Sequence, residues 1–189
     1  MYRSGQSAER SGTYRPDATY CNSFRISDLH AAGPGQHASP TLRYIKVKCR
    51  ILYRESVQDI TFEKYQPKRI QSLKLVEATP RYGYKYADRE ELTRLLTRKG
   101  EADEILVTCK GLITDTTFSN VVFRQGEHYF TPDSWLLNGT KRQKLLREGR
   151  IIEKRITRET LHEYDSVSLI NAMLDIEDTI PVPVSSIFH

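Results

Sequence analysis

Cysteine is scarce in this chain of 189 residues and is spread too thinly to build a metal site or a disulfide framework. The three cysteines, Cys21, Cys49 and Cys109, are an odd number, lie far apart and include no Cys-x-x-Cys pair. Zinc sites and small disulfide-bonded domains show paired spacings instead. We therefore expect no bound metal, and reduced thiols in a cytoplasmic protein.

Long apolar runs are missing as well. The longest, such as residues 105–107, fall far short of the roughly 20 apolar residues that a membrane-spanning helix needs. No charged start followed by an apolar stretch marks a secretory signal. With 38% apolar and 28% charged residues, the composition is typical of a globular protein, and we expect no membrane partner.

The common catalytic motifs are also absent. The chain contains no Gly-x-Ser-x-Gly elbow, no Walker loop, no Gly-x-Gly-x-x-Gly fingerprint and no His-Glu-x-x-His pair. The sequence therefore gives no support to the hydrolases, nucleotidases, dinucleotide enzymes and zinc proteases that carry these motifs. The five histidines are spread out without metal-ligand spacing, so we interpret them as surface or structural residues.

The charge is basic overall but is not gathered into a stripe. The net charge is +5, and the basic residues are scattered among acidic ones. The densest basic cluster, residues 140–144, is more typical of a solvated helix face than of a DNA-binding surface. We expect no nucleic acid partner, although an anionic small ligand would also account for a local basic cluster.

The first 40 residues show no clear period, and a strand pattern begins after Leu42. Alternation of apolar and polar residues over 45–53 predicts a strand with one buried face. Further strands are predicted at 59–63 and 73–77. Because Pro67 interrupts both helix and sheet pairing, the segment around it is the best candidate for a linker between two lobes.

The clearest helix begins at Asp88, where Asp88 and Glu91 have the spacing of a capping box. An apolar stripe of three leucines follows, and Gly100 is placed to end the helix. After it we predict strands at 104–109, 112–114, 120–124 and 128–130, a helix from 140 to 148, a helix from 157 through 164 and a closing strand at 166–170. This order predicts the α+β class rather than a regular βαβ series.

Five segments of the chain, taken together, resemble one enzyme family. They are the Lys85–Arg89 spacing at a helix start, the Gly111–Phe123 signature, the Thr131-Pro132 step, the Leu137–Arg142 loop and the Asn171-Ala172 pair. Their order and spacing resemble those of fold-type IV enzymes that use pyridoxal 5'-phosphate (PLP), the group of class IV aminotransferases and aminodeoxychorismate lyases. The resemblance covers residues 45–184.

The resemblance implies that Lys85 holds the cofactor covalently and later moves protons at the substrate's α-carbon. It implies that Asp115 lies beside the pyridine nitrogen and keeps it protonated, at a position where most relatives carry the longer Glu. Taken locally, Lys85 would be an exposed lysine at a helix start and Asp115 a β-turn aspartate. Their place among the five segments favours the cofactor roles.

The resemblance also implies a phosphate site at the start of the predicted helix, where Gly139, Thr140 and Lys141 offer backbone N–H groups. In this chain Lys141 stands where the family usually carries Thr, so only the backbone contacts carry over. Asn171-Ala172 matches a cofactor-binding segment on the last strand. Arg10 is the candidate for the family's early His-x-x-Arg phosphate contact, here without the His.

The fold implied by the resemblance is two-lobed α+β, of the D-amino acid aminotransferase type. The expected domains are residues 1–66, an N-terminal lobe, and residues 67–189, a β-barrel-like cofactor lobe. The family's opening strand-turn-strand is absent, so we expect the N-terminal part to be shortened or divergent. Relatives are homodimers with the cofactor between the lobes, so a homodimer is expected.

The favoured activity is that of an aminodeoxychorismate lyase of folate biosynthesis, which eliminates pyruvate from an amino acid-like small molecule to give an aminobenzoate. The Lys-x-x-x-Arg spacing and Asn171-Ala172 favour this lyase. A class IV aminotransferase of branched-chain or D-amino acid type would use the same residues and stays open. A non-catalytic relative that keeps the fold also stays open, favoured by the atypical first 40 residues and by Asp115.

Overall fold

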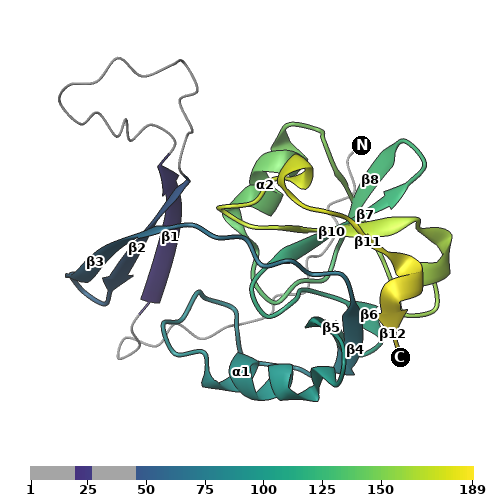
Figure 1. Ribbon diagram of the computed structural model, residues 1–189, viewed down its shortest axis with the longest axis horizontal. Coiled ribbons are helices and arrows are strands. Elements are labelled where there is room, and N and C mark those ends of the chain that lie inside the picture. The colour runs from purple at the N-terminus through teal and green to yellow at the C-terminus, as the bar shows by residue number, and fades with distance from the viewer. Residues whose placement is uncertain (1–19, 27–45) are drawn as a thin grey trace, which may run out of the picture.

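The computed structural model describes residues 20–26 and 46–189, which form three β-sheets, two α-helices and four short 3-10 helices (Figure 1). Strands and helices are mixed without a repeating βαβ unit, so the predicted α+β class is confirmed. Within the described residues, neither α-helix has the length and apolar character that a membrane crossing requires.

Sheet A is an antiparallel sheet of β1 (Tyr20–Ile26), β2 (Val47–Tyr53) and β3 (Val57–Lys64), in that order. The predicted strand at 45–53 is confirmed as β2, but only Cys49 on it is buried, and all of β3 is exposed. Sheet A stands to one side of the other two sheets (Figure 1), and no residue of β2 or β3 joins a core cluster of the described residues. The expected buried face therefore forms only in part.

Strand β1 was not predicted, because its sequence has no clear period. It pairs with β2 along its whole length, from Tyr20 opposite Tyr53 to Ile26 opposite Val47. Backbone N–H and C=O groups can form a ladder of hydrogen bonds in any non-proline sequence. Pairing with β2 therefore makes this segment a strand although its side chains show no alternation.

Sheet B has the order β12-β4-β5-β6, and sheet C the order β11-β10-β7-β8-β9. Sheet B consists of β12 (Ile187–Phe188), β4 (Leu73–Glu77), β5 (Glu104–Cys109) and β6 (Leu112–Ile113), with β4 parallel to both β5 and β12. Sheet C consists of β11 (Val182–Pro183), β10 (Ser166–Ile170), β7 (Asn120–Gln125), β8 (His128–Pro132) and β9 (Ile152–Lys154).

The core forms four layers: α1 (Glu90–Leu96), sheet B, sheet C and α2 (Thr140–Arg147). Alternation along each strand separates the layers. Leu106 of β5 packs toward sheet C, whereas its neighbour Ile105 packs with Leu92 of α1. On β7, Phe123 lies between the sheets and Val122 packs against α2 through Leu145. Period-2 patterning thus buries both faces of both sheets.

Helix α1 begins two residues later than predicted, at Glu90. The Asp88 side chain accepts a hydrogen bond from the Glu90 N–H at 2.8 Å, but Glu91 accepts from the Arg81 N–H at 3.1 Å instead of closing a capping box. The 3-10 helix Thr97–Lys99 continues α1 to Gly100, whose φ of 58° ends it as expected.

Two other predictions need correction. The helix expected over 157–164 is only the 3-10 helix Leu161–Glu163, because Thr157 forms a β-bridge with Leu112 and is drawn toward sheet B. Strand β10 does not close the chain, since the 3-10 helices Ile176–Asp178 and Val184–Ser186 and the strands β11 and β12 follow it. Both incorrect predictions concern segments that pair with strands distant in the sequence, and this pairing outweighs the local sequence pattern.

Residues 65–72 connect β3 to β4 without regular structure, at the place predicted for the linker. The division of the chain into lobes at residue 66 stays a prediction. Cys49 and Cys109 are both buried and free.

Candidate cofactor and substrate site

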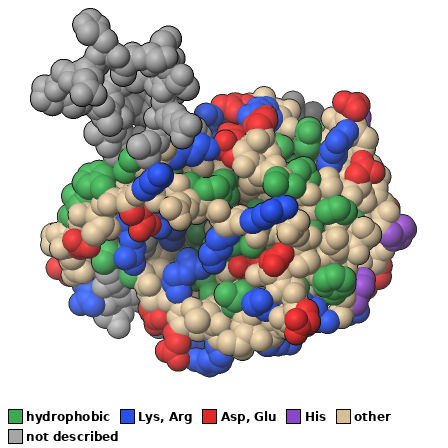
Figure 2. Space-filling view, viewed as in Figure 1, with side chains coloured by type: hydrophobic (Ala, Val, Ile, Leu, Met, Phe, Trp, Pro, Cys, Tyr) green, Lys and Arg blue, Asp and Glu red, His purple; other side chains and the backbone are tan. Residues whose placement is uncertain are grey.

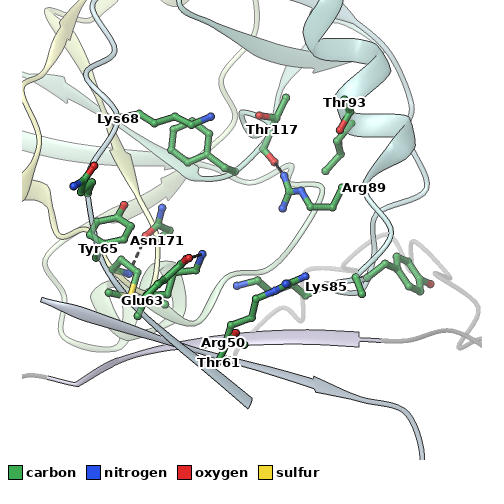
Figure 3. A pocket seen from close by; sticks show the side chains of 18 of the residues that line it. Arg50, Thr61, Glu63, Tyr65, Lys68, Lys85, Arg89, Thr93, Thr117 and Asn171 are labelled. Carbon is green, nitrogen blue, oxygen red and sulfur yellow. Dashed lines mark hydrogen bonds and ion pairs between the residues drawn. The ribbon is translucent and has the colours of Figure 1, made fainter. Parts of the chain in front are cut away.

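A cavity of about 740 Å³ opens between sheet A, the start of α1 and the segment that follows β10 (Figure 3). This volume lies in the range of small-molecule sites in proteins. Lys85, Asn171 and Ala172, three of the residues predicted from the sequence, line it. The structure thus brings together two segments that are more than 80 residues apart in the sequence.

Basic side chains outnumber acidic ones in the lining of this cavity. Six of the lining residues are Lys or Arg: Lys48, Arg50, Lys64, Lys68, Lys85 and Arg89. Among the described residues that line the cavity, Glu63 is the only one with a carboxylate, and its oxygen lies 2.6 Å from the Lys48 ammonium. Figure 2 shows Lys and Arg side chains gathered on this face of the molecule. The excess of positive charge favours an anionic cofactor or substrate.

Lys85 lies in the irregular segment between β4 and α1 and is half-buried. The backbone turns around it, since the Tyr86 N–H donates to the Tyr84 carbonyl at 2.9 Å. The rings of the two tyrosines meet edge to face at 6.1 Å. Figure 3 shows Lys85 and Arg50 on one side of the cavity, with Lys68 and Thr117 across from them. The turn therefore presents Lys85 at the cavity wall.

Arg89 connects the Lys85 segment to another wall of the cavity. Its guanidinium donates to the Thr117 carbonyl and, at 3.3 Å, to the Tyr82 hydroxyl, and it lies 5.8 Å from the centre of the Tyr82 ring. The bond to Thr117 is drawn in Figure 3. The Lys-x-x-x-Arg spacing seen in the sequence thus places two residues on the same segment: Lys85, the candidate cofactor lysine, and Arg89, which bonds the segment to Thr117.

Asn171 and Ala172 lie just after β10 and form the opposite wall with Met173. The Asn171 Oδ1 accepts from the Met173 N–H at 2.8 Å, which fixes the turn. Burial raises the pKa of the Tyr65 hydroxyl, and its hydrogen bond with Asn171 opposes that effect. Tyr65 therefore stays neutral and polar at this wall.

Asp115 is buried, with 5% of its surface exposed, and does not line the cavity. Its Oδ2 accepts from the N–H groups of Leu136 and Leu137, both at 2.9 Å, and its Oδ1 accepts from the Asn120 amide at 2.9 Å. Burial raises the pKa of Asp115 to about 6, against the opposing effect of these bonds and of the Arg142 charge. Three of the roughly four acceptor positions of the carboxylate are used within the protein.

Gly139, Thr140 and Lys141 also lie outside the cavity lining. Gly139 is the extended residue before α2, with φ −67° and ψ 147°, and no side chain caps the helix start. The Lys141 ammonium is held 2.6 Å from a carboxylate oxygen of Asp175. The predicted helix geometry is present, so the first N–H groups of α2 point out of the helix start.

Arg142, the last residue of the 137–142 motif, shapes the turn before α2 from inside. It is 2% exposed, and its guanidinium donates to the Pro132 carbonyl at 2.8 Å and to the Asn138 side chain at 3.1 Å. It also pairs with Glu153. Arg10, the remaining predicted contact, lies outside the described residues.

Several cavity residues were not predicted from the sequence. They are Arg50 on β2, Tyr65 and Lys68 in the connection after β3, and Thr117 in the loop before β7. The run of basic residues on one face of the 45–53 strand was the available signal for Arg50. No local pattern marks the other three, because their place at the cavity depends on how distant segments pack.

Comparison with known proteins gives a consistent result. The model of the class IV amino-transferase family matches residues 63–187. An uncharacterized protein of Haemophilus influenzae is 38% identical over 128 residues, which are 67% of this chain and 68% of that protein.

Two solved structures are also similar. One is described as a putative 4-amino-4-deoxychorismate lyase from Haemophilus somnus 129pt, with 37% identity and a TM-score of 0.67, covering 74% of this chain and 71% of the other. An aminotransferase from Brucella abortus bound to PLP shares the fold at 22% identity and a TM-score of 0.58, covering 77% of this chain and 62% of the other. The chain therefore belongs to the class IV aminotransferase family of PLP-dependent enzymes.

Proposed function

We propose that this chain is a lyase of the aminodeoxychorismate lyase type, which eliminates pyruvate from its substrate to leave an aminobenzoate. The observation that carries the proposal is the position of Lys85 at the wall of a cavity. Of the charged residues that line this cavity, six are basic and one is acidic. Further support comes from the 37% identity to the Haemophilus somnus protein that is described as such a lyase. On this proposal the enzyme serves folate biosynthesis in the cytoplasm.

The residues present fit PLP. The cavity offers a lysine amine for the cofactor's aldehyde, a volume that admits cofactor and substrate together, and cations for phosphate and carboxylate groups. When bound, PLP supplies an electron sink for negative charge that develops at the substrate's α-carbon. Lys85 would hold the cofactor and, once released by substrate, take the proton from that carbon.

Asp115 is proposed to hold the proton of the pyridine nitrogen, directly or through one water. Among the described residues its Oδ1 accepts one hydrogen bond, from Asn120, so a second acceptor position on this atom can take a donor. A cationic partner there would favour the ionised carboxylate, against the burial that raises its pKa to about 6.

The start of α2 is proposed as the phosphate site. Gly139 leads into the helix with extended geometry, and the backbone N–H groups of Thr140 and Lys141 follow in the first turn. Such N–H groups bind anions, helped by the positive end of the helix dipole. Asn171 and Ala172 would contact the cofactor from the cavity, which they line, and Arg10 would add a cation from outside the described residues.

The second candidate is a class IV aminotransferase acting on branched-chain or D-amino acids. The family model favours it, because that model describes aminotransferases. Lys85 would then carry the proton from the substrate's α-carbon to the cofactor. A non-catalytic relative is the third candidate, favoured by the hydrogen bonds within the protein that already occupy the Asp115 carboxylate. In each case we propose a homodimer, as in relatives of this family.

One sequence of measurements separates the three candidates. Purified protein is mixed with PLP, and the absorbance band of the lysine-bound cofactor is recorded. Aminodeoxychorismate is then added without any keto acid, and pyruvate is assayed. Pyruvate release supports the lyase. Turnover only with an amino acid and a keto-acid acceptor supports the aminotransferase, and absence of the absorbance band supports the non-catalytic relative.

A further inference from the structure

We propose that Glu104 is a positioning residue, which acts through Thr117 and Arg89 to hold the Lys85 segment at the cavity wall. The inference rests on the proposed role of Lys85. It concerns a buried carboxylate that no step of the proposed reaction uses, at the first residue of β5.

Glu104 is fully buried, with 0% of its surface exposed. Its Oε1 accepts from the Ile105 N–H at 2.9 Å, and its Oε2 accepts from the Thr117 hydroxyl at 3.0 Å. Among residues 46–189, no Lys, Arg or His lies within ion-pair distance of it. A buried carboxylate without a cation opposes folding, so its presence calls for a role other than stability.

Thr117 is held at two points by two different segments. Its side-chain hydroxyl donates to Glu104 on β5, and its backbone carbonyl accepts from Arg89 at the start of α1. Thr117 also lines the cavity, while being only 6% exposed. Thr117 therefore connects the buried Glu104 with the segment that carries Lys85.

The Lys85 segment meets the 116–119 loop at Arg89. Residues 83–89 lie outside any helix or strand of more than one residue, and the Arg89 side chain bonds to the Thr117 carbonyl of that loop. The same loop runs from Asp115 to Asn120, which bond to each other at 2.9 Å. Glu104 thus anchors, through one hydroxyl, both the lysine and the loop that is proposed to face the cofactor ring.

The test compares Thr117→Val with Thr108→Val. Both threonines are buried and donate their hydroxyl to a glutamate on sheet B, Thr108 to Glu77 at 2.6 Å, but Thr108 does not line the cavity. Valine keeps the shape and removes the donor. Two readouts are used: the rate at which the lysine-bound PLP band forms, and the labelling rate of Lys85 by an amine-directed reagent, followed by peptide mass spectrometry without cofactor.

We expect Thr117→Val to slow formation of the band on the order of tenfold or more, because a reacting group displaced by about 1 Å loses up to a hundredfold in rate. Labelling of Lys85 should become faster as its segment loosens. Thr117→Ser, which keeps the hydroxyl, should restore both rates. Thr108→Val should change neither, although it lowers the midpoint of thermal unfolding.

Equal behaviour of Thr117→Val and Thr108→Val would overturn the positioning role. If Thr117→Val does not fold, Glu104→Gln and Glu104→Leu are compared instead, since glutamine keeps the volume and one acceptor whereas leucine has none. Wild-type rates in Glu104→Gln with slower band formation in Glu104→Leu support the positioning role. Wild-type rates in both variants overturn it. If wild-type protein forms no band with PLP, the proposed function fails. The labelling of Lys85 then still decides whether Glu104 positions it.

Discussion

A Cβ atom on Gly139 would lie 2.1 Å from the side-chain Oδ1 of Asn120. The Asn120 side chain cannot easily move away, because its amide donates to Asp115 at 2.9 Å and to the Leu137 carbonyl at 2.8 Å. The glycine of the 137–142 motif is therefore required here by close approach. Its φ of −67° is open to any residue, so conformational freedom is not the reason.

Gly139→Ala is expected to destabilise the protein by about 1–3 kcal/mol, the usual penalty for forcing an extra methyl group into a packed site. The free energy of unfolding, measured by urea denaturation, checks this. The change should also weaken anion binding at α2, because the turn before the helix has to shift.

Asn120→Ala provides the control for this prediction. Alone it should destabilise the protein, because Asp115 and Leu137 each lose a hydrogen-bond donor. Adding Gly139→Ala to it should cause little further loss, because the clashing atom is gone. Strictly additive effects of the two changes would contradict the close-contact explanation.

Lys85→Ala should abolish both the lysine-bound PLP band and turnover while leaving the fold intact. The reason is that Lys85 alone occupies the position of the family's cofactor lysine. Treatment with PLP and borohydride, followed by peptide mapping, locates the modified lysine. Lys68→Ala is the matched control, since Lys68 lines the same cavity with its ammonium 5.2 Å from the centre of the Phe118 ring. A reducible adduct that survives in Lys85→Ala and vanishes in Lys68→Ala would move the assignment to Lys68.

Asp115 should make stability depend on pH between about 4 and 6. Its pKa is about 6 in the folded protein and 3.8 in the reference state, so the native state binds the proton more tightly. The stabilisation is complete below pH 4, is lost as the pH rises to about 6, and stays constant above that. The difference between these two pKa values corresponds to about 3 kcal/mol of unfolding free energy.

The check is urea denaturation of wild type and Asp115→Asn across pH 4–7. The difference in unfolding free energy should change over this range, while other carboxylates cancel. Asparagine also replaces one acceptor oxygen by an N–H donor, so the variant should lose at least one of the hydrogen bonds to this side chain at every pH. A pH-independent difference would show that the carboxylate ionises normally in the fold.

The start of α2 should bind inorganic phosphate or sulfate, with the anion resting against the N–H groups of Thr140 and Lys141. Lys141→Met should weaken phosphate binding only modestly, because the Lys141 ammonium is already 2.6 Å from Asp175. Titration followed by amide chemical shifts measures both proteins. Loss of binding in Lys141→Met would show that the side chain, rather than the helix start, holds the anion.

The order of elements from β2 to α2 could be predicted because it depends on short-range patterns, whereas β9 and the segment 157–164 were missed. Alternation over 45–53 and the apolar run over 105–107 each predict a strand from local sequence alone. The five motif segments likewise indicate the family from residue types and spacing alone. The Lys85 segment belongs to this group: its sequence placed the lysine just before a helix, and the structure has it there.

The partners of the predicted residues could not be predicted, because each partner comes from a distant segment. Asp115 meets the N–H groups of Leu136 and Leu137 more than 20 residues later, which turns a proposed cofactor contact into an anchor for the turn before α2 as well. The start of α1 lost its capping box for a similar reason, when Glu91 bonded to Arg81 instead.

The sequence by itself determined the family and the elements from β2 to α2, since these follow from residue types at fixed local spacings. The role of Lys85 follows from the same spacings and stays a prediction. Tertiary structure decided that β1 pairs with β2, that the 157–164 segment is not a helix, and that Arg50 and Thr117 share a cavity with Lys85. The physical reason is the same in each case. The partner in a hydrogen bond, or the residue that lines a cavity, is whichever segment the tertiary packing brings close. A local stretch of sequence does not identify that segment.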